Sequence, residues 1–202
     1  MGLLRDTIKD VVQPCLLDVS GSWSSAMVDA YLISLAGVIS GETIKIGGIN
    51  APRTTASNAA LLTLQLAGNI ITVNETLGPN LIVNSDFALW TDDNPDGFGV
   101  TEADENNYVT ENIGGCRFVS NGSASNIYQN PLTGGKYYRV NLDFIAYVSG
   151  ILRLTMNVNL STGVGPKSVL YRTGGKYITP QVLVTSAPID LTIDNLIVQE
   201  VL

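Results

Sequence analysis

The chain has 202 residues, of which 45% are hydrophobic and 14% charged, so it can form a folded core and is not of the disordered class. Its 11 basic and 18 acidic residues give a formal charge of −7, which disfavours binding to nucleic-acid phosphates. Histidine is absent, so the commonest general base and the commonest zinc ligand are missing.

The N-terminus lacks the uninterrupted apolar run of a signal peptide, because Arg5, Asp6, Lys9 and Asp10 break it up. No stretch reaches the ~18 consecutive apolar residues of a membrane span. The two cysteines are far apart in the sequence and fit no metal-binding spacing, and we predict that both are buried free thiols. We therefore expect synthesis and folding in a cytoplasm, with no membrane partner. The cysteines are Cys15 and Cys116.

The first predicted element is a short amphipathic helix over residues 3–13, which ends before Pro14. Its apolar side chains recur at helical spacing. Such a terminal helix either packs on the core of its own chain or docks into a partner. The apolar residues are Leu4, Ile8, Val11 and Val12.

A partial repeat follows, because LISLAGVI at 32–39 returns as TLQLAGNI at 63–70, 31 residues later. Each copy is predicted to end a helix at a glycine, Gly37 or Gly68, and to lead into a short strand. The predicted strands are residues 43–46 and 70–73. The glycine-rich segment between the two copies lacks the lysine of a phosphate-binding loop, and we interpret it as a plain loop that ends in a Thr or Ser helix cap. A domain boundary is predicted at Gly78-Pro79.

Two helix–strand units are too few for a self-standing solenoid. The segment loosely resembles caps of leucine-rich repeats and short N-terminal modules of bacteriophage fibre proteins. We expect this segment, residues 1–78, to bury its apolar side chains against the following domain or against copies of itself, with a homotrimer as the prediction. Besides the terminal helix, the side chains expected to need partners are Leu32, Leu35, Leu61, Leu64 and Leu66.

From residue 80 onward the apolar residues alternate with polar ones, which predicts antiparallel strands with one buried face. Residues 137–148 and 152–160 are predicted to form a long hairpin around Ser149-Gly150. The even-numbered residues face inward, among them Leu142, Phe144, Val148 and Leu154. Two similar segments, TGGKYY at 133–138 and TGGKYI at 173–178, are each predicted to open a strand after a Gly-Gly turn. Mainly β structure is therefore expected over residues 79–202, after a small α/β segment.

Four segments of this part carry a resemblance. They are NLIVNSDF at 80–87, PDGF at 95–98, GKYY at 135–138 and IDNLIVQE at 193–200. In this order they resemble motifs of jelly-roll carbohydrate-binding modules of the family 4/9 (CenC-like) type. The resemblance implies an antiparallel jelly-roll β-sandwich, in which Asn84-Ser85-Asp86 forms the first turn.

The resemblance also implies a sugar site on a polar sheet face that carries aromatic rings. The alternative is an ordinary solvated face or a subunit interface. Residues of the predicted polar face are Tyr137, Arg139, Asn141, Asp143, Tyr147, Arg153, Asn157 and Asn159.

Family members often hold a structural Ca²⁺ ion, which the resemblance would assign to Asp86 and Asp194. The glutamate that follows the phenylalanine in the family motif is Ala88 here, so a hydrogen-bonded closure without metal is the alternative. No other cofactor is expected.

Catalysis is not expected. The acidic residues of segment 91–107, including Asp92, Asp93 and Asp96, are spaced as turn formers rather than as a catalytic pair. No serine nucleophile motif is present.

The sequence thus favours a virion protein of the bacteriophage fibre or decoration type. It would be made in the host cytoplasm, would contact other virion proteins through residues 1–78, and would display a domain for bacterial surface glycans in host attachment. A standalone bacterial lectin-like module is the alternative, and a structural ornament without ligand is a third class.

Overall fold

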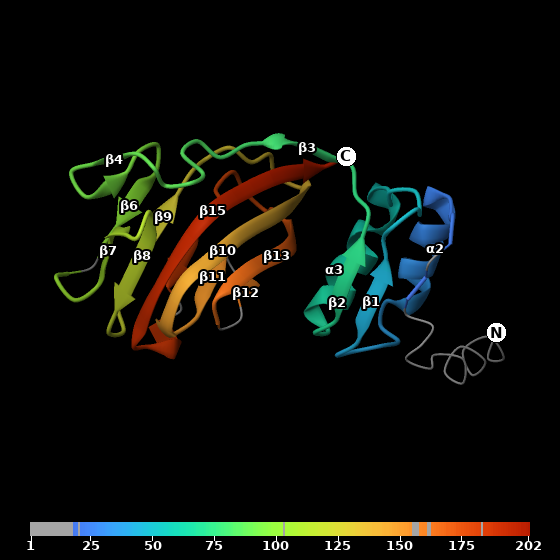
Figure 1. Ribbon diagram of the computed structural model, residues 1–202, viewed down its shortest axis with the longest axis horizontal. Coiled ribbons are helices and arrows are strands. Elements are labelled where there is room, and N and C mark those ends of the chain that lie inside the picture. Colours follow the sequence, from blue (N-terminus) through green and yellow to red (C-terminus); the bar gives the residue numbers. More distant parts are fainter. Residues whose placement is uncertain (1–17, 20, 103, 155–157, 161–162, 183) are drawn as a thin grey trace. The chain divides into compact units, whose positions relative to one another are not determined.

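The computed structural model describes residues 18–19, 21–102, 104–154, 158–160, 163–182 and 184–202 (Figure 1). The chain forms two compact units, Met1–Gly78 with Val201–Leu202, and Pro79–Glu200. The predicted helix at 3–13 lies outside the described residues, as does Cys15. No described helix is long and apolar enough to cross a membrane.

The described residues of the N-terminal unit form two α-helices, α2 (Ser25–Leu35) and α3 (Asn58–Leu66), and two parallel strands, β1 (Thr43–Ile46) and β2 (Ile70–Val73). Both predicted strands are confirmed at the predicted residues. The helices are followed by Gly37 and Gly68, each with a positive φ that a residue with a side chain rarely adopts. Thr54 caps a 3-10 helix before α3, as the loop prediction required.

Four of the five helix leucines expected to need partners are buried within the unit, which corrects part of that expectation. Leu32, Leu35, Leu61 and Leu64 are all buried together with Ile44 and Ile46 of β1. Only Leu66 of the predicted set is largely exposed among the described residues. The two helices cover one face of a two-stranded parallel sheet, so even this short repeat encloses a core.

Asparagine side chains tie the successive turns of this repeat together. The Asn50 amide donates to the carbonyls of Val19 (2.9 Å) and Ile46 (3.1 Å), and its oxygen accepts from the Trp23 amide (2.9 Å). Asn74 in the next turn donates to the Asn50 carbonyl (2.8 Å). These bonds satisfy backbone groups of irregular segments that would otherwise be buried without partners.

The C-terminal unit is an antiparallel β-sandwich, as predicted. Its six-stranded sheet has the order β13-β10-β15-β8-β7, with β3 also paired to β15, and its five-stranded sheet has the order β12-β11-β14-β9-β6. The strands of the first sheet are β3 (Leu77–Asn80), β7 (Tyr108–Asn112), β8 (Gly115–Ser120), β10 (Tyr137–Ser149), β13 (Gly165–Arg172) and β15 (Ile189–Val201). Those of the second are β6 (Gly99–Thr101), β9 (Asn126–Tyr128), β11 (Leu152–Leu154), β12 (Val158–Leu160) and β14 (Pro180–Val182).

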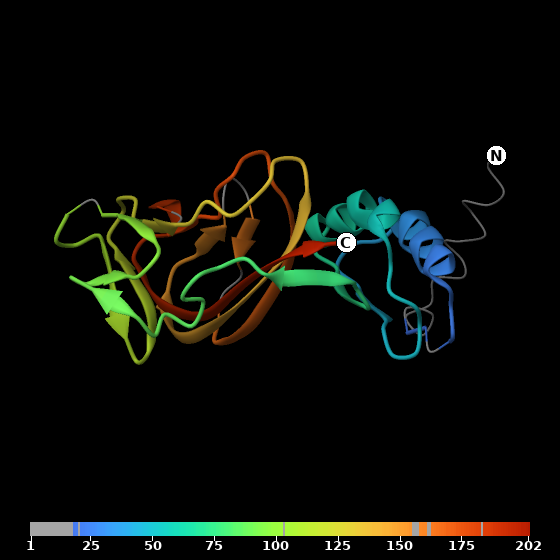
Figure 2. The ribbon, with the colours of Figure 1, turned by 90° about the horizontal axis from the view of Figure 1, so that it is seen from above.

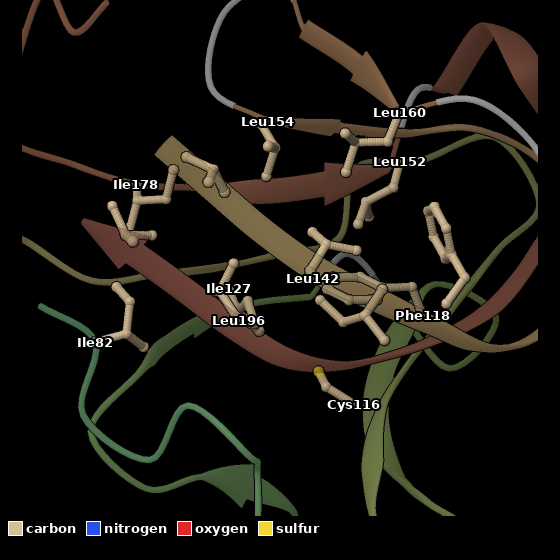
Figure 3. Packing of buried hydrophobic residues seen from close by; sticks show 14 of the residues in the cluster. Ile82, Cys116, Phe118, Ile127, Leu142, Leu152, Leu154, Leu160, Ile178 and Leu196 are labelled. Atoms are coloured by element: carbon tan, nitrogen blue, oxygen red, sulfur yellow. The ribbon is translucent and has the colours of Figure 1, made fainter. Parts of the chain in front are cut away.

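The core of the sandwich lies between these sheets (Figure 3). It includes Leu142 from one sheet and Leu152 and Leu154 from the other, together with Phe118 and Ile127. Cys116 is a buried free thiol in this core, and burial raises its pKa, which agrees with its prediction.

The predicted hairpin of residues 137–160 is wrong. Strand β10 pairs with β13 and β15, whereas β11 pairs with β12 and β14 in the other sheet. The chain changes sheets at Gly150, which has φ +94 and lies so close to Ile189 that a Cβ atom there would be 2.5 Å from the Ile189 side chain. Alternation in the sequence shows which side chains face the core, but it does not show to which of the two sheets their strand belongs.

The long strands β10 and β15 run side by side and bend strongly (Figure 1 and Figure 2). Their register shifts between Phe144 and Ala146 and again between Tyr147 and Ser149. The shift after Phe144 places an extra residue of β10 opposite β15, so from there to the next shift the odd-numbered side chains of β10 face the core. Val148, which was predicted to point inward, is therefore 74% exposed, and Tyr147 packs against the core instead.

The first turn of the sandwich is built around Asn84, which has φ +52. Its side chain donates to the carbonyls of Leu89 (2.8 Å) and Asp96 (3.1 Å) and accepts from the Leu89 amide (3.0 Å). Phe87 is fully buried and Trp90 packs against the core. Asn84-Ser85-Asp86 therefore form a turn, as the resemblance implied, and the residues that follow the turn enter the core.

Candidate functional site

The predicted polar face is divided between the two sheets, so it is not one platform. Four of its residues lie on the outer face of the six-stranded sheet, alternating along β10 with buried residues. Arg153 and Asn159 lie on the outer face of the five-stranded sheet. Tyr147 is turned inward, and its hydroxyl donates to the Gly150 carbonyl (3.1 Å). Asn157 is outside the described residues. The four residues on β10 are Tyr137, Arg139, Asn141 and Asp143.

On the six-stranded sheet, these groups are engaged with their neighbours. The Arg172 guanidinium lies 5.7 Å from the centroid of the Tyr137 ring, which it covers. Asn195 donates to Asp143 (3.0 Å). A shallow cavity of about 410 Å³ opens beside Asn141 and Asp143.

The five-stranded sheet carries a straight row of polar side chains across its outer face. Strand register places Asn159 opposite Arg153, Arg153 opposite Gln181, and Gln181 opposite Asn126. Asn126 in turn lies opposite Thr101. Each of these residues alternates along its strand with core residues, so all five project from the same face.

Two tyrosine rings stand beside this row. Tyr128 follows Asn126 by two residues on β9, and Tyr177 comes from the loop before β14. The ring centroids are 6.0 Å apart with the planes at 77°, an edge-to-face pair. The side chains are 38% and 51% exposed, respectively.

The rings border a cavity of about 500 Å³, which we call the tyrosine cavity. Its size is within the range of small-ligand sites. Its walls combine aromatic rings with amide and hydroxyl groups. They are formed by Asn126, Tyr128, Tyr171, Gly175, Tyr177, Thr179 and Gln181.

Tyr128 is held over its strand partner Gly99. A Cβ atom at position 99 would lie 2.3 Å from Tyr128 Cζ, so the ring occupies the space of a missing side chain. Glycine at this position lets the ring lie across the neighbouring strand instead of projecting freely into solvent.

The two Gly-Gly turns found in the sequence are hydrogen-bonded to each other beside Tyr177. Gly135 donates to the Thr173 carbonyl (2.8 Å) and Leu132 donates to the Lys176 carbonyl (2.9 Å). Within the second turn, the Thr173 hydroxyl donates to the Gly175 carbonyl (2.7 Å) and accepts from its amide (3.0 Å). These bonds position Tyr177. The repeated segment was the signal in the sequence that pointed to this loop, whereas Tyr128, Asn126 and Gln181 lie in strands too short to show alternation.

The predicted metal ligands Asp86 and Asp194 lie near enough to influence each other. Burial raises the pKa of Asp194, the Asn195 amide lowers it, and the charges of Asp86 and Asp143 raise it further, with a net rise. Among the described residues no three acidic, cysteine or histidine side chains are grouped to hold a metal ion. The Ser85 carbonyl accepts the Leu196 amide (2.8 Å), which joins the first turn to β15 without metal.

Comparisons with known proteins concern the fold only. No protein-family model matches the chain, and no curated protein does. Among solved structures, the enzymatically active domain of bacteriophage CBA120 tailspike protein 4 is similar at 15% identity and TM-score 0.43, over 65% of this chain and 22% of that one.

Two carbohydrate-binding modules are also similar. A module of family 4 matches at 13% identity and TM-score 0.40, over 59% of this chain and 99% of that one. A family 29 module from Piromyces equi matches at 12% identity and TM-score 0.38, over 52% of this chain and 80% of that one. These values assign the chain neither a family nor a function.

Proposed function

We propose that this protein binds a glycan, without catalysis, in the tyrosine cavity of its β-sandwich. The observation that carries the proposal is the pair of partly exposed rings, Tyr128 and Tyr177, next to a row of polar side chains. The apolar face of a sugar ring packs on aromatic rings, while its hydroxyl groups need nearby hydrogen-bond partners.

The polar groups of the cavity match that need. Asn126 and Gln181 each offer an amide that both donates and accepts, and Thr179 adds a hydroxyl. Such groups can exchange bonds with water for bonds with a sugar hydroxyl at little cost, so their number and spacing would set specificity. The proposed site therefore moves from the predicted single face to the five-stranded sheet.

The acidic segment is better explained by turns than by chemistry. Asp92 and Asp93 connect the short strands β4 (Trp90–Thr91) and β5 (Asn94–Pro95), and both have positive φ. The Asp92 carbonyl accepts from the Asn94 side chain (3.1 Å). The backbone conformation of this tight turn thus accounts for Asp92 and Asp93, which supports a binding role over glycoside hydrolysis.

Removal of either ring tests the proposal. Tyr128→Ala and Tyr177→Ala are each expected to weaken binding to glycans identified on an array of bacterial surface polysaccharides by about tenfold or more, because each removes a packing surface at the centre of the site. The melting temperature should stay close to that of the parent. Tyr137→Ala, on the other sheet, is the matched control and should bind normally. Loss of binding in the control alone would contradict the proposed location.

We also propose that a Ca²⁺ ion binds between Asp86 and Asp194. Calcium takes 6–8 oxygen ligands, so two carboxylates would have to be joined by backbone oxygens and water. Burial, and after it the charges of Asp86 and Asp143, raise the pKa of Asp194, and the ion would offset these effects. Without the ion, ionisation of Asp194 is an electrostatic cost of folding.

Asp194→Asn measures this cost. Because the folded-state pKa of Asp194 is raised, ionisation opposes folding, and stability falls as the pH rises from the unfolded value through the folded one. The variant keeps an acceptor for the Asn195 amide. With a chelator present, its melting temperature is expected to be higher than that of the parent at pH 7 and equal to it at low pH.

Calcium would be revealed by the same pair of proteins. Added Ca²⁺ should raise the melting temperature of the parent and leave Asp194→Asn unchanged. A variant that melts below the parent in chelator would contradict the electrostatic cost, and a parent whose melting temperature does not rise with Ca²⁺ would contradict the calcium site.

We also propose that the protein is a virion component of the bacteriophage fibre or decoration type, made in the host cytoplasm, with a standalone bacterial lectin-like module as the alternative. Support comes from the presence of a helix–strand repeat unit before a proposed glycan-binding unit. Mass spectrometry of purified phage particles and of uninfected bacteria would decide between the two origins.

The proposed trimer rests on apolar side chains exposed on the N-terminal unit, since large exposed apolar areas mark interfaces. Light scattering of the full chain should give the mass of three copies, and the mass of one copy would remove the proposal. The exposed residues are Met27, Ile33, Val38, Ile49, Leu66 and Ile70.

A further inference from the structure

Charge is distributed unevenly along this acidic chain. Of its 11 Lys and Arg residues seven lie within residues 112–189, whereas of its 18 Asp and Glu residues only Asp143 lies there. This segment contributes every strand of the five-stranded sheet except β6. A locally basic segment in a chain of net charge −7 suggests a partner of negative charge.

Two of the seven cations adjoin the tyrosine cavity. Arg153 lies directly opposite Gln181, a cavity residue, at the ~4.8 Å spacing of neighbouring strands. Lys176 is exposed and stands between Gly175 and Tyr177, which both line the cavity. The two cations therefore come from different elements, β11 and the second Gly-Gly turn.

Neither cation is neutralised within the described structure. The five strands of this sheet, like the turn at 173–179, contain no Asp or Glu. Among the described residues, nearby cations of the same segment are paired elsewhere, Arg117 with Asp190 and Lys136 with Glu200. Arg153 donates from Nε to the Asn159 side chain (3.3 Å), a neutral partner that orients the guanidinium without cancelling its charge.

We infer that the glycan bound in the tyrosine cavity is anionic and carries a carboxylate or phosphate group that Arg153 and Lys176 contact; this inference rests on the proposed function. A guanidinium binds carboxylate and phosphate through paired, charge-assisted hydrogen bonds, and an ammonium adds a mobile point charge. The two tyrosines would pack on a sugar ring while the cations hold its acidic substituent. Local cations are needed because the net charge of the chain repels an anion.

The test compares the parent with the double variant Arg153→Gln/Lys176→Gln on an array of purified bacterial surface polysaccharides. Each polysaccharide is present in native form and after chemical reduction of its carboxylates to alcohols. The variant is expected to lose about tenfold or more in affinity, and binding of the parent should weaken as NaCl is raised. Arg153→Lys/Lys176→Arg preserves both charges and should retain most of the binding. Lys45→Gln, in the N-terminal unit, is the control for a general change in net charge.

The outcomes separate the possible ligands. Loss of parental binding on carboxylate reduction identifies a carboxylate, whereas retained binding together with loss in the double variant identifies phosphate or another strong acid. Salt-independent binding, or equal binding by parent and double variant, would overturn the inference and leave the proposed glycan function intact. Absence of binding to every polysaccharide, charged or neutral, would overturn the proposed function itself.

Discussion

Leu154→Asp is expected to unfold the β-sandwich. Leu154 lies on β11, is fully buried, and belongs to the core between the sheets. The substitution removes a large apolar side chain and places a carboxyl group where no water reaches it. The combined cost is on the order of 5 kcal/mol or more, comparable with the whole stability of a typical domain. Thermal and urea unfolding would measure this loss.

Val148→Asp is the matched control for this change. The two residues occupy the same, inward phase of the alternation in the sequence, but the register shifts of β10 leave Val148 exposed. A carboxylate at position 148 would remain hydrated, so this variant should melt close to the parent. Unfolding of Val148→Asp, or a stable Leu154→Asp, would show that the inner face is assigned incorrectly.

Glu75→Gln is expected to unfold the N-terminal unit. Glu75 forms an ion pair with Arg53, whose side chain is fully buried. The substitution keeps a hydrogen-bond acceptor and removes the charge, so it leaves a buried cation whose principal counter-ion is gone. Breaking a buried pair in this way costs roughly 3–5 kcal/mol. Glu42→Gln, which changes an exposed acid in the same unit, is the control and should cost little.

The two tryptophans let each unit be followed separately. Trp23 packs edge-to-face on Tyr31 in the N-terminal unit, with ring centroids 5.3 Å apart. Trp90 lies in the sandwich, where its indole donates to the Phe87 carbonyl (2.6 Å). Glu75→Gln in a Trp90→Phe background should shift the fluorescence transition, and in a Trp23→Phe background it should not. A shift of the Trp90 signal alone would contradict the assignment.

The buried ion pair was not foreseen from the sequence. Arg53 lies in a loop segment that was interpreted only by its capping residues, and Glu75 lies just beyond the predicted strand 70–73. Asp29, on α2, joins this cluster: burial raises its pKa, but hydrogen bonds from Ser57 and Thr54 and the charge of Arg53 outweigh that and lower it. The residues of this cluster come from segments far apart in the chain, so no local sequence pattern predicts that they are in contact.

Local patterns did determine several features of this protein. Helix endings at Gly37 and Gly68 and the strands at 43–46 and 70–73 were predicted correctly, because glycine conformation and short apolar runs act within a few residues. The same holds for the turn at Asn84, whose side chain bonds to backbone groups close by. The inward side chains of β10 up to Phe144 also followed from alternation alone.

Only the tertiary structure decided which strands are neighbours. The alternation of residues 137–160 is the same whether the chain folds back in one sheet or crosses to another, since side-chain direction depends on the strand and not on its partner. That crossing separates Arg153 from Asn141 and Asp143, while pairing brings Arg153 next to Gln181, which in turn lies opposite Asn126. The composition and strand periodicity of this sequence specify a β-sandwich; its proposed binding site depends on contacts between segments far apart in the chain.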